Sequence, residues 1–481
     1  MKKIVKLMFL PILFSLLMNG CERSSFTTTT ETVIAIENQS PTRAAIPPTI
    51  MPTAEGNTIL VTSAYDSGDG TLRQALQDAK PYDLITFDPS VFPPNFPTSI
   101  ILTSSLPEIS QGNLTIDASN AGVILDGSQV TGNGLSISSN SNTVRGLQIV
   151  GFSDAGIGLF GGAKFNVIGG DTNIGDGQFG QGNLLSGNGN FGIGLWNTGT
   201  SYNTIQGNFI GIGVDGESIL GQERDGIHSN GADNNLITSN FIGGNDSGIY
   251  LCCVANGGNI VTNNNIGTDM GGENELGNNS AGIILDRTGF NIIGPNNIIA
   301  FNTGQGISLW DETSYNTITK NSIYNNGEQG IKLANPNIRP APIIFDFDLQ
   351  AGSITGVTCP NCIVEVFSDY AEEGAFYEGQ TVAENTGVFT INTGVNFTGS
   401  HLTATATDSD GNTSNFSVPT SGTNRMLTLQ EGNILTKTPI QPKRSQYLED
   451  NYIGNVYEGY DRYSNTESIY GLGYKWMRLL S

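Results

Sequence analysis

The chain has 481 residues, of which 63 are glycine, and only 14% are charged. This length allows two or three domains, and the glycine content favours tight turns over long amphipathic helices. Acidic residues number 44 against 21 basic residues, which gives a net charge of −23. A nucleic-acid partner is excluded on this balance, because a phosphate backbone would be repelled instead of releasing counterions.

Residues 1–20 have the pattern of an export signal. Lys2 and Lys3 precede an apolar run, Leu7 to Met18, that is too short to span a bilayer. The segment Leu-Met-Asn-Gly-Cys at 17–21 resembles the cleavage box of bacterial lipoproteins, and the resemblance implies a lipid on Cys21. We therefore expect an exported protein, lipid-anchored in a membrane at the bacterial cell surface or outer membrane. Plain secretion with an incidental cysteine is the alternative.

Residues 21–56 are rich in Thr, Ser and Pro. Such a composition cannot bury a core, so we expect a flexible tether that holds the folded part away from the membrane.

The stretch that begins at residue 57 combines strand-like runs with one short helix. TLRQAL at 71–76 places Leu72, Ala75 and Leu76 on one helix face. Together with DLITFDPSVF at 83–92 and LTIDAS at 114–119, it resembles the S/T-L-R-E/Q-A-I/L module that begins many bacterial surface β-helix proteins. In that family the helix covers the open end of the first coil. We expect the same cap here, with Arg73 in a structural salt bridge.

A Gly-aliphatic-x-aliphatic phrase recurs from Gly134 to Leu333 every 22 to 36 residues, which indicates a solenoid. The aliphatic residues alternate with outward residues, as strand periodicity requires. An asparagine follows each phrase, and we expect these side chains to hydrogen-bond between successive coils. The asparagines are Asn142, Asn166, Asn203, Asn235, Asn259, Asn291 and Asn316.

Residues 57–340 resemble the pectin-lyase-like family on these repeats. The resemblance implies an all-β fold: a right-handed single-stranded parallel β-helix with a short N-terminal capping helix and a small C-terminal β-sandwich. The Asn-Thr-Asp, Gly-His-Gly and Arg-Ile-Lys sets of polygalacturonase-like members are absent. The DPH motif of alginate epimerases is absent too, and DGIH at 225–228 is only superficially similar to it.

Two coils carry similar insertions, which start at Ile210 and Ile266. Their carboxylates could bind calcium, which takes several hard oxygen ligands, but the spacing matches neither an EF-hand nor a nonapeptide calcium repeat. We therefore expect solvated loops, with calcium as the alternative, and the sequence identifies no other cofactor. The acidic residues concerned are Asp215, Glu217, Asp269, Glu273 and Glu275.

Residues 341–421 are predicted to form short strands. VEVFSD at 364–369 and LTATATDSDGNTSNFS at 402–417 resemble the immunoglobulin-like β-sandwich that often follows such β-helices. We expect Cys359 and Cys362 to form a disulfide that staples a turn. The adjacent Cys252 and Cys253 could be free, form a vicinal disulfide or hold a soft metal. The sequence does not predict a structure for 422–481.

Alignment of the repeats by their glycine places aromatic residues in one outward column. Trp196 and Trp310 would lie four coils apart, about 19 Å at the spacing of stacked strands. With Phe160, they would suit the apolar ring faces of a sugar chain. The column contains Phe160, Trp196, Asn230, Cys252, Asp286, Trp310 and Ala334.

This face is predicted to bind an extracellular polysaccharide. Asp286 and Asp311, one coil apart, would suit a glycoside hydrolase. A polysaccharide lyase or uronate epimerase would instead use a base and a cation, for which His228, Tyr250 and Arg287 are candidates and Asp225 is adjacent. The alternative is a non-catalytic adhesin or structural surface protein that uses the β-helix as a rigid spacer. We expect a monomer in either case.

Overall fold

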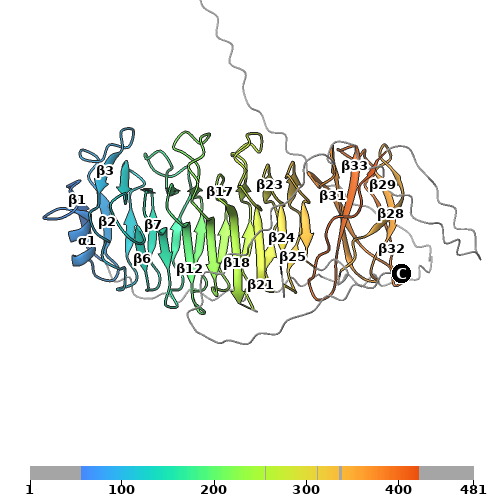
Figure 1. Ribbon diagram of the computed structural model, residues 1–481, viewed down its shortest axis with the longest axis horizontal. Coiled ribbons are helices and arrows are strands. Elements are labelled where there is room, and N and C mark those ends of the chain that lie inside the picture. Colours follow the sequence, from blue (N-terminus) through green and yellow to red (C-terminus); the bar gives the residue numbers. More distant parts are fainter. Residues whose placement is uncertain (1–55, 255, 311–312, 335–338, 422–481) are drawn as a thin grey trace, which may run out of the picture.

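The computed structural model describes residues 56–421 except 255, 311–312 and 335–338 (Figure 1). The predicted export signal, Cys21, nearly all of the tether, Asp311 and residues 422–481 therefore lie outside the described residues. Among the described helices, none is long and apolar enough to cross a membrane.

Three parallel sheets run along the length of the molecule, and the chain visits them in turn, once per coil (Figure 1). The first sheet contains, in coil order, β1 (Thr58–Val61), β2 (Leu84–Phe87), β4 (Thr115–Asp117), β7 (Thr143–Arg145), β10 (Val167–Gly169), β13 (Thr204–Gln206), β16 (Leu236–Thr238), β19 (Ile260–Thr262), β22 (Ile292–Ile293) and β25 (Thr317–Ile318). The second contains β3 (Thr98–Ile101), β5 (Val123–Asp126), β8 (Leu147–Val150), β11 (Leu184–Ser186), β14 (Phe209–Ile210), β17 (Phe241–Ile242), β20 (Asn265–Ile266), β23 (Ile298–Ala300) and β26 (Ser322–Tyr324). The third contains β6 (Leu135–Ile137), β9 (Ala155–Leu159), β12 (Phe191–Trp196), β15 (Asp225–Asn230), β18 (Ser247–Val254), β21 (Ile283–Thr288), β24 (Ile307–Leu309) and β27 (Ile331–Leu333). This arrangement confirms the predicted parallel β-helix.

Aliphatic side chains fill the interior in columns. Ile193, Ile227, Ile249, Ile283 and Ile307 are paired in register along the third sheet, and all are fully buried. Each buried side chain of this size contributes about 1.5–3 kcal/mol of hydrophobic stabilisation. A slip of one residue would turn the whole column outward, so the aliphatic pattern fixes the register.

Asparagine side chains connect the coils at the turns, as predicted. The backbone N–H and the side-chain amide of Asn203 both donate to Oδ1 of Asn235 at 2.9 Å, and the same pattern joins every coil from Asn142 to Asn316. The structure adds two ladders that the sequence analysis missed. One contains Asn183, Asn208, Asn240, Asn264, Asn297 and Asn321. The other contains Asn188, Gln222, Asn245, Asn278, Asn302 and Asn326.

The N-terminal end is closed by α1 (Leu72–Asp78), as predicted. Thr71 caps the helix by accepting from the backbone N–H of Gln74 at 3.3 Å. The apolar face of the helix is buried in the β-helix core. Arg73 pairs with Asp66 at 2.5 Å and also donates to the carbonyls of Ser104 and Ser105, which confirms its structural role.

The C-terminal part is a small β-sandwich of two antiparallel sheets that share one apolar core. The first sheet contains β28 (Ile343–Asp348), β29 (Ser353–Val357) and β32 (Val388–Asn392). The second contains β31 (Phe376–Val382), β30 (Ile363–Asp369), β33 (His401–Thr407) and β34 (Thr420–Ser421). The predicted disulfide between Cys359 and Cys362 joins the two ends of the turn before β30.

The sandwich closes the last coil by continuing its hydrogen bonds. Glu373 accepts from the backbone N–H of Asn326 at 3.0 Å, where a further coil would place an asparagine oxygen. Glu365 accepts from the hydroxyl of Thr319 at 2.5 Å and from the backbone N–H of Lys320 at 3.0 Å. Both carboxylates are buried. The backbone N–H groups at this end of the β-helix therefore bind protein groups instead of water.

The Glu373 carboxyl makes stability depend on pH. Burial raises its pKa to about 7, from an ordinary value of 4.5, and the nearby Asp369 adds to this effect. A folded-state pKa above the unfolded one contributes stability that is complete below about pH 4.5 and is lost as the pH rises through 7. We predict that Glu373→Gln will be more stable than the parent at pH 8, by about 2–3 kcal/mol, and that the two will converge near pH 5. Denaturant unfolding at both pH values measures this difference. The exposed Glu384→Gln is the control, and an equal difference at both pH values would contradict the prediction.

The asparagine ladders satisfy polar groups that are buried at the turns. Asn240→Ala removes the acceptor for the backbone and side-chain N–H groups of Asn208, which are buried. We expect a loss of about 2–4 kcal/mol in the free energy of unfolding, because each buried unsatisfied group costs about 1–3 kcal/mol. Chemical denaturation measures this loss, with the exposed Asn396→Ala as a matched control. Equal stability of the two variants would show that water replaces the ladder without cost.

Candidate functional site

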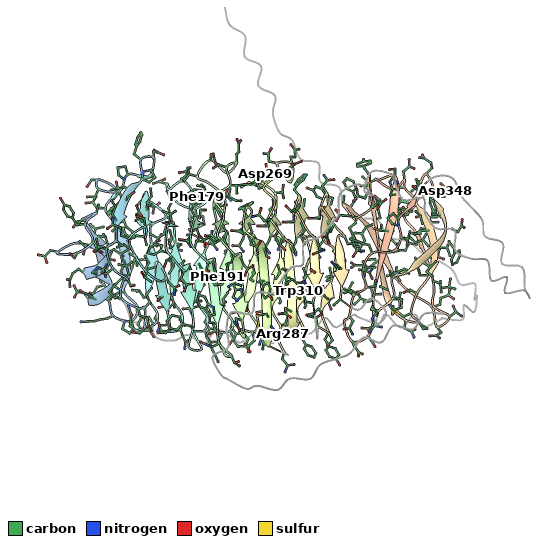
Figure 2. The ribbon with its side chains drawn as sticks, in the orientation of Figure 1. Phe179, Phe191, Asp269, Arg287, Trp310 and Asp348 are labelled. Atoms are coloured by element: carbon green, nitrogen blue, oxygen red, sulfur yellow. A yellow bond between two sulfur atoms is a disulfide. The ribbon has the colours of Figure 1, made fainter. Side chains whose placement is uncertain are left out.

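An open pocket of about 400 Å³ lies on the outward face of the third sheet, over β15, β18 and β21. Figure 2 places Phe191, Trp310 and Arg287 on this face, whereas Asp269 projects from the upper edge of the molecule. The pocket is lined by five of the predicted residues: Asp225, His228, Tyr250, Arg287 and Trp310. One outward face thus brings together most of the residues chosen from the sequence.

The register of the third sheet places Trp196 beside the coil that carries His228. His228 is paired with Gly194 on one side and with Tyr250 on the other. A Cβ atom on Gly194 would lie 2.1 Å from the ring of Trp196, so this ring occupies the space over the glycine. The small residue therefore lets Trp196 lie along the sheet instead of projecting into solvent.

Aromatic rings follow one another across the coils in a continuous row. The ring centroids are 4.4 Å apart between Phe191 and His228, and 5.3 Å apart between His228 and Tyr250, with both pairs stacked. Trp196 meets Phe191 at 6.1 Å, and Trp310 meets Tyr250 edge-on at 5.7 Å. The two tryptophans predicted to bracket the site are therefore the ends of one row.

Trp310 and Phe160 differ in their relation to the pocket. Trp310 remains 44% exposed, and its indole N–H donates to the hydroxyl of Ser308 at 3.0 Å, which holds the ring against the sheet. Phe160 follows β9, two coils before His228, and is not among the residues that line the pocket. The sequence alignment placed Phe160 in the right column but not within reach of this pocket.

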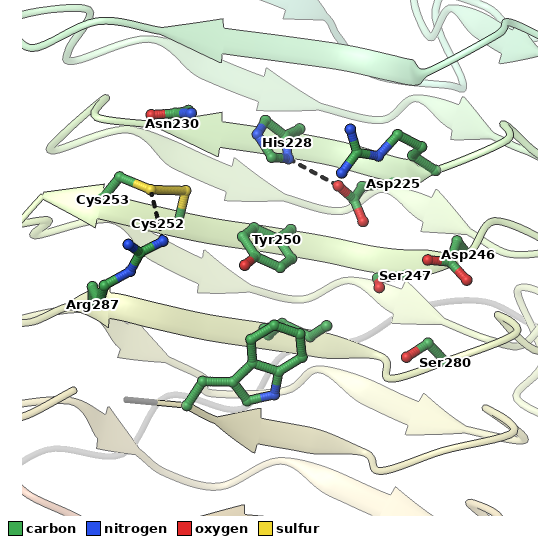
Figure 3. A pocket seen from close by; sticks show the side chains of 13 residues that line it. Asp225, His228, Asn230, Asp246, Ser247, Tyr250, Cys252, Cys253, Ser280 and Arg287 are labelled. Carbon is green, nitrogen blue, oxygen red and sulfur yellow. Dashed lines mark hydrogen bonds and ion pairs between the residues drawn. A yellow bond between two sulfur atoms is a disulfide. The ribbon is translucent and has the colours of Figure 1, made fainter. Parts of the chain in front are cut away.

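The side chains of Asp225 and His228 form a buried pair at 2.8 Å, between the carboxylate and Nδ1 (Figure 3). With its proton on Nδ1, the neutral ring keeps a lone pair on Nε2. Within residues 56–421 as described, Nε2 has no hydrogen-bond partner. The pair thus presents an oriented imidazole that can accept a proton from a molecule in the pocket.

The carboxylate of Asp286 is bound by its neighbours. It accepts from the hydroxyl of Tyr250 at 3.0 Å and from Arg287 Nη2 at 2.9 Å. Burial raises the pKa of the Tyr250 hydroxyl above its usual value, and the hydrogen bond to Asp286 raises it further. Tyr250 therefore stays protonated at neutral pH, and Asp286 orients Tyr250 and Arg287. Asp311, its predicted partner in hydrolysis, lies outside the described residues.

Two charged residues that the sequence analysis did not choose also line the pocket, Arg224 and Asp246. The Arg224 guanidinium lies 5.7 Å from the centre of the Phe191 ring. Burial raises the pKa of the Asp246 carboxyl, and the charge of Asp225 adds to the effect. Each of the two residues stands two positions before a repeat glycine. The alignment by glycine therefore also contains a signal for Arg224 and Asp246, at the position two residues before each glycine.

Cys252 and Cys253, whose state the sequence left open, form a vicinal disulfide in the pocket wall (Figure 3). Among the described residues, no group of three His, Cys, Asp or Glu side chains is placed to hold a metal ion. In the first insertion, Asp215 accepts from the backbone N–H of Ser218 at 2.8 Å, which lowers the pKa of its carboxyl. Asp269 accepts from the backbone N–H of Glu273 at 2.9 Å in the second insertion. These carboxylates stabilise their own turns.

Comparison with known proteins gives a partial family match and distant structural likenesses. Residues 271–338 match the family model described as "Periplasmic copper-binding protein (NosD)". The periplasmic alginate epimerase AlgG has 16% identity and a TM-score of 0.36, over 54% of this chain and 58% of that one. Pectate lyase Pel9A has 15% identity and a TM-score of 0.34, over 58% and 76%. The A-module of Azotobacter vinelandii mannuronan C-5 epimerase AlgE4 has 13% identity and a TM-score of 0.31, over 55% and 76%. No curated protein matches the chain.

The fit of Trp196 over Gly194 can be tested directly. Gly194→Ala places a methyl group against the indole, so the ring has to move outward. We predict a red shift of the tryptophan emission and a loss of about 1–3 kcal/mol in stability, as for other overpacked sites. Gly271→Ala is the control, because its added methyl group would meet no atom closer than 3.6 Å. Unchanged emission in Gly194→Ala would show that the ring does not occupy this space.

Proposed function

We propose that the pocket binds an extracellular polysaccharide that contains uronic acids, and that it removes the proton next to a sugar carboxylate, as a lyase or a uronate epimerase does. The observation that supports this most is the buried pair of Asp225 and His228, whose Nε2 has no partner among the described residues. This pair lies in an open pocket that is also lined by arginines.

The walls of the pocket suit such a chain. Sugar rings have apolar C–H faces, and the row of rings that ends at Trp310 offers surfaces for them. Arg224 and Arg287 line the same pocket and would attract the carboxylates of the chain, despite the net negative charge of the protein. Hydrolysis is less well supported, because Asp286 is bound by Tyr250 and Arg287.

The reaction begins when His228 Nε2 takes the proton from the carbon next to the carboxylate. Asp225 then stabilises the imidazolium, and an arginine offsets the negative charge that develops on the carboxylate. In a lyase the electron pair forms a carbon–carbon double bond while the C–O bond to the leaving sugar breaks, and the oxygen of the leaving sugar takes up a proton from solvent. In an epimerase a proton from solvent is added to the same carbon on the opposite face. Tyr250 keeps its proton throughout and serves as a hydrogen-bonding group.

We also propose that the protein is exported and anchored through a lipid on Cys21. The pattern of residues 1–21 supports this proposal, and the description of the family matched by 271–338 names a periplasmic protein. We do not propose copper binding, because the described residues contain no group of three His, Cys, Asp or Glu side chains that could hold a metal ion.

The exchange of the carbon-bound proton with solvent distinguishes these functions. In deuterium oxide, lyase and epimerase products carry different signals, and both are visible by NMR spectroscopy of uronic-acid polymers. We predict that His228→Gln lowers the rate of proton abstraction about 10²–10⁴-fold, the usual contribution of a general base. Asp225→Asn should also slow it, because the imidazolium loses the negative charge that stabilises it. Asp215→Asn, in the first insertion, is the control and should leave the rate unchanged.

Two outcomes would contradict the proposal. An unchanged rate in His228→Gln would exclude this histidine as the base. Binding of a glycan without any proton exchange or cleavage would instead support the alternative of a non-catalytic adhesin. A wild-type protein that neither binds nor changes any member of a panel of acidic and neutral glycans would exclude both functions.

A further inference from the structure

The vicinal disulfide stands at one end of the pocket. Figure 3 shows Cys252, Cys253 and Arg287 together at the C-terminal ends of the strands, and Asp225, Asp246 and Ser280 at the opposite ends, with His228 and Tyr250 between them. Cys252 is buried, whereas Cys253 is exposed. The disulfide therefore exposes sulfur at this end of the pocket.

The backbone does not need this disulfide to make its turn. Cys253 has a left-handed conformation, with φ of 69°. The two preceding coils make the same turn at the residues that follow Trp196 and Asn230, with φ of 77° at Asn197 and 79° at Gly231. Neither of those residues is a cysteine. The shape of the turn therefore does not explain why a disulfide is present here.

The disulfide lies beside a cation that is held in place. Arg287 Nη2 is 3.8 Å from Cys253 Sγ, and the same guanidinium is bound to Asp286. The Arg287 side chain is 58% exposed and lines the pocket. An apolar, polarisable surface and an accessible positive charge thus adjoin each other.

We propose that the Cys252–Cys253 disulfide and Arg287 form a subsite for one uronic acid residue of the polysaccharide. The sugar ring packs its C–H face against the disulfide, and its carboxylate binds the guanidinium. This inference rests on the proposed function and assigns a second sugar position to the same pocket. Arg287 stands two coils from His228, about 10 Å across the stacked strands, and three residues further along its strand than Ile284, which is in register with His228. The subsite therefore holds a neighbour of the sugar that loses its proton.

The preceding coil supplies a matched variant. Cys252 is paired with Asn230, and Gly231 follows, so Cys252→Asn with Cys253→Gly copies the neighbouring coil and keeps a residue that tolerates the left-handed turn. The control is Cys359→Ser with Cys362→Ser, which removes the disulfide of the sandwich instead. Thermal unfolding establishes that each variant is folded.

The experiment measures dissociation constants by calorimetry for oligouronates of increasing length. We expect the double variant at 252 and 253 to weaken binding of the longest oligomer about tenfold, as for the loss of one stacking contact, and to leave the shortest oligomer that binds unaffected. Arg287→Gln should show the same dependence on length. The control at 359 and 362 should bind as the parent does.

Reduction of the parent protein gives a second measurement that needs no mutation. Dithiothreitol supplies two electrons and two protons, breaks the sulfur–sulfur bond and leaves as its cyclic disulfide. Affinity for the longest oligomer should fall on reduction and return on reoxidation, in the parent and in the control at 359 and 362 alike.

The outcomes separate the two proposals. Equal affinities of the parent and the double variant at every length, with no effect of reduction, would overturn the subsite and leave the proposed function standing. Equal weakening at every length would also overturn it, because the disulfide would then act on the whole pocket. Absence of any oligouronate binding by the parent would overturn both proposals.

Discussion

The need to satisfy buried backbone groups at the turns governs this structure. A parallel β-helix turns its chain three times in every coil, and each turn would leave polar groups without water. Here the groups are satisfied by amide side chains that donate to the next coil, in three ladders that run along the molecule. The ladders hold each coil at one height and one rotation above its neighbour. The outward side chains of successive coils are therefore aligned too.

The candidate site is a direct consequence of this alignment of the coils. Residues far apart in the sequence, such as His228, Tyr250 and Trp310, become neighbours because their coils are stacked in register. A pocket then requires only that the side chains down one column differ in size and polarity from coil to coil. Gly194 makes room for one aromatic ring, and the following coils place polar and aromatic groups where glycine stood. The site is therefore a local departure from the repeat on a face whose geometry the repeat maintains.

The sequence predicted the fold and the columns of outward residues, because both follow from the repeat. It did not predict the contacts between individual side chains. Periodic aliphatic residues, one asparagine ladder and the TLRQAL helix identified the fold, and the column frame found His228, Tyr250 and Trp310. Because the period says nothing of side-chain pairing, the sequence could not show that Asp286 is bound by Tyr250 and Arg287. The two further ladders also have a sequence signal, because Asn208 follows Asn203, and Asn240 follows Asn235, at the same spacing of five residues. Insertions such as those that start at Ile210 and Ile266 interrupt this spacing in other coils. The sandwich contacts of Glu365 and Glu373 join segments with unrelated patterns, which no periodicity reveals.

The ladders also give the molecule a direction along its axis. Within each ladder the backbone N–H groups donate toward the C-terminal coils, so the final coil presents the N–H of Asn326, which needs an acceptor beyond it. Whole coils could be added or lost in the interior during evolution, since every internal coil both donates and accepts. The last position is different, because only a group that accepts can follow it. Coils can therefore be inserted between existing coils, whereas the C-terminal coil must be followed by a group that accepts hydrogen bonds. In this chain the β-sandwich supplies that group.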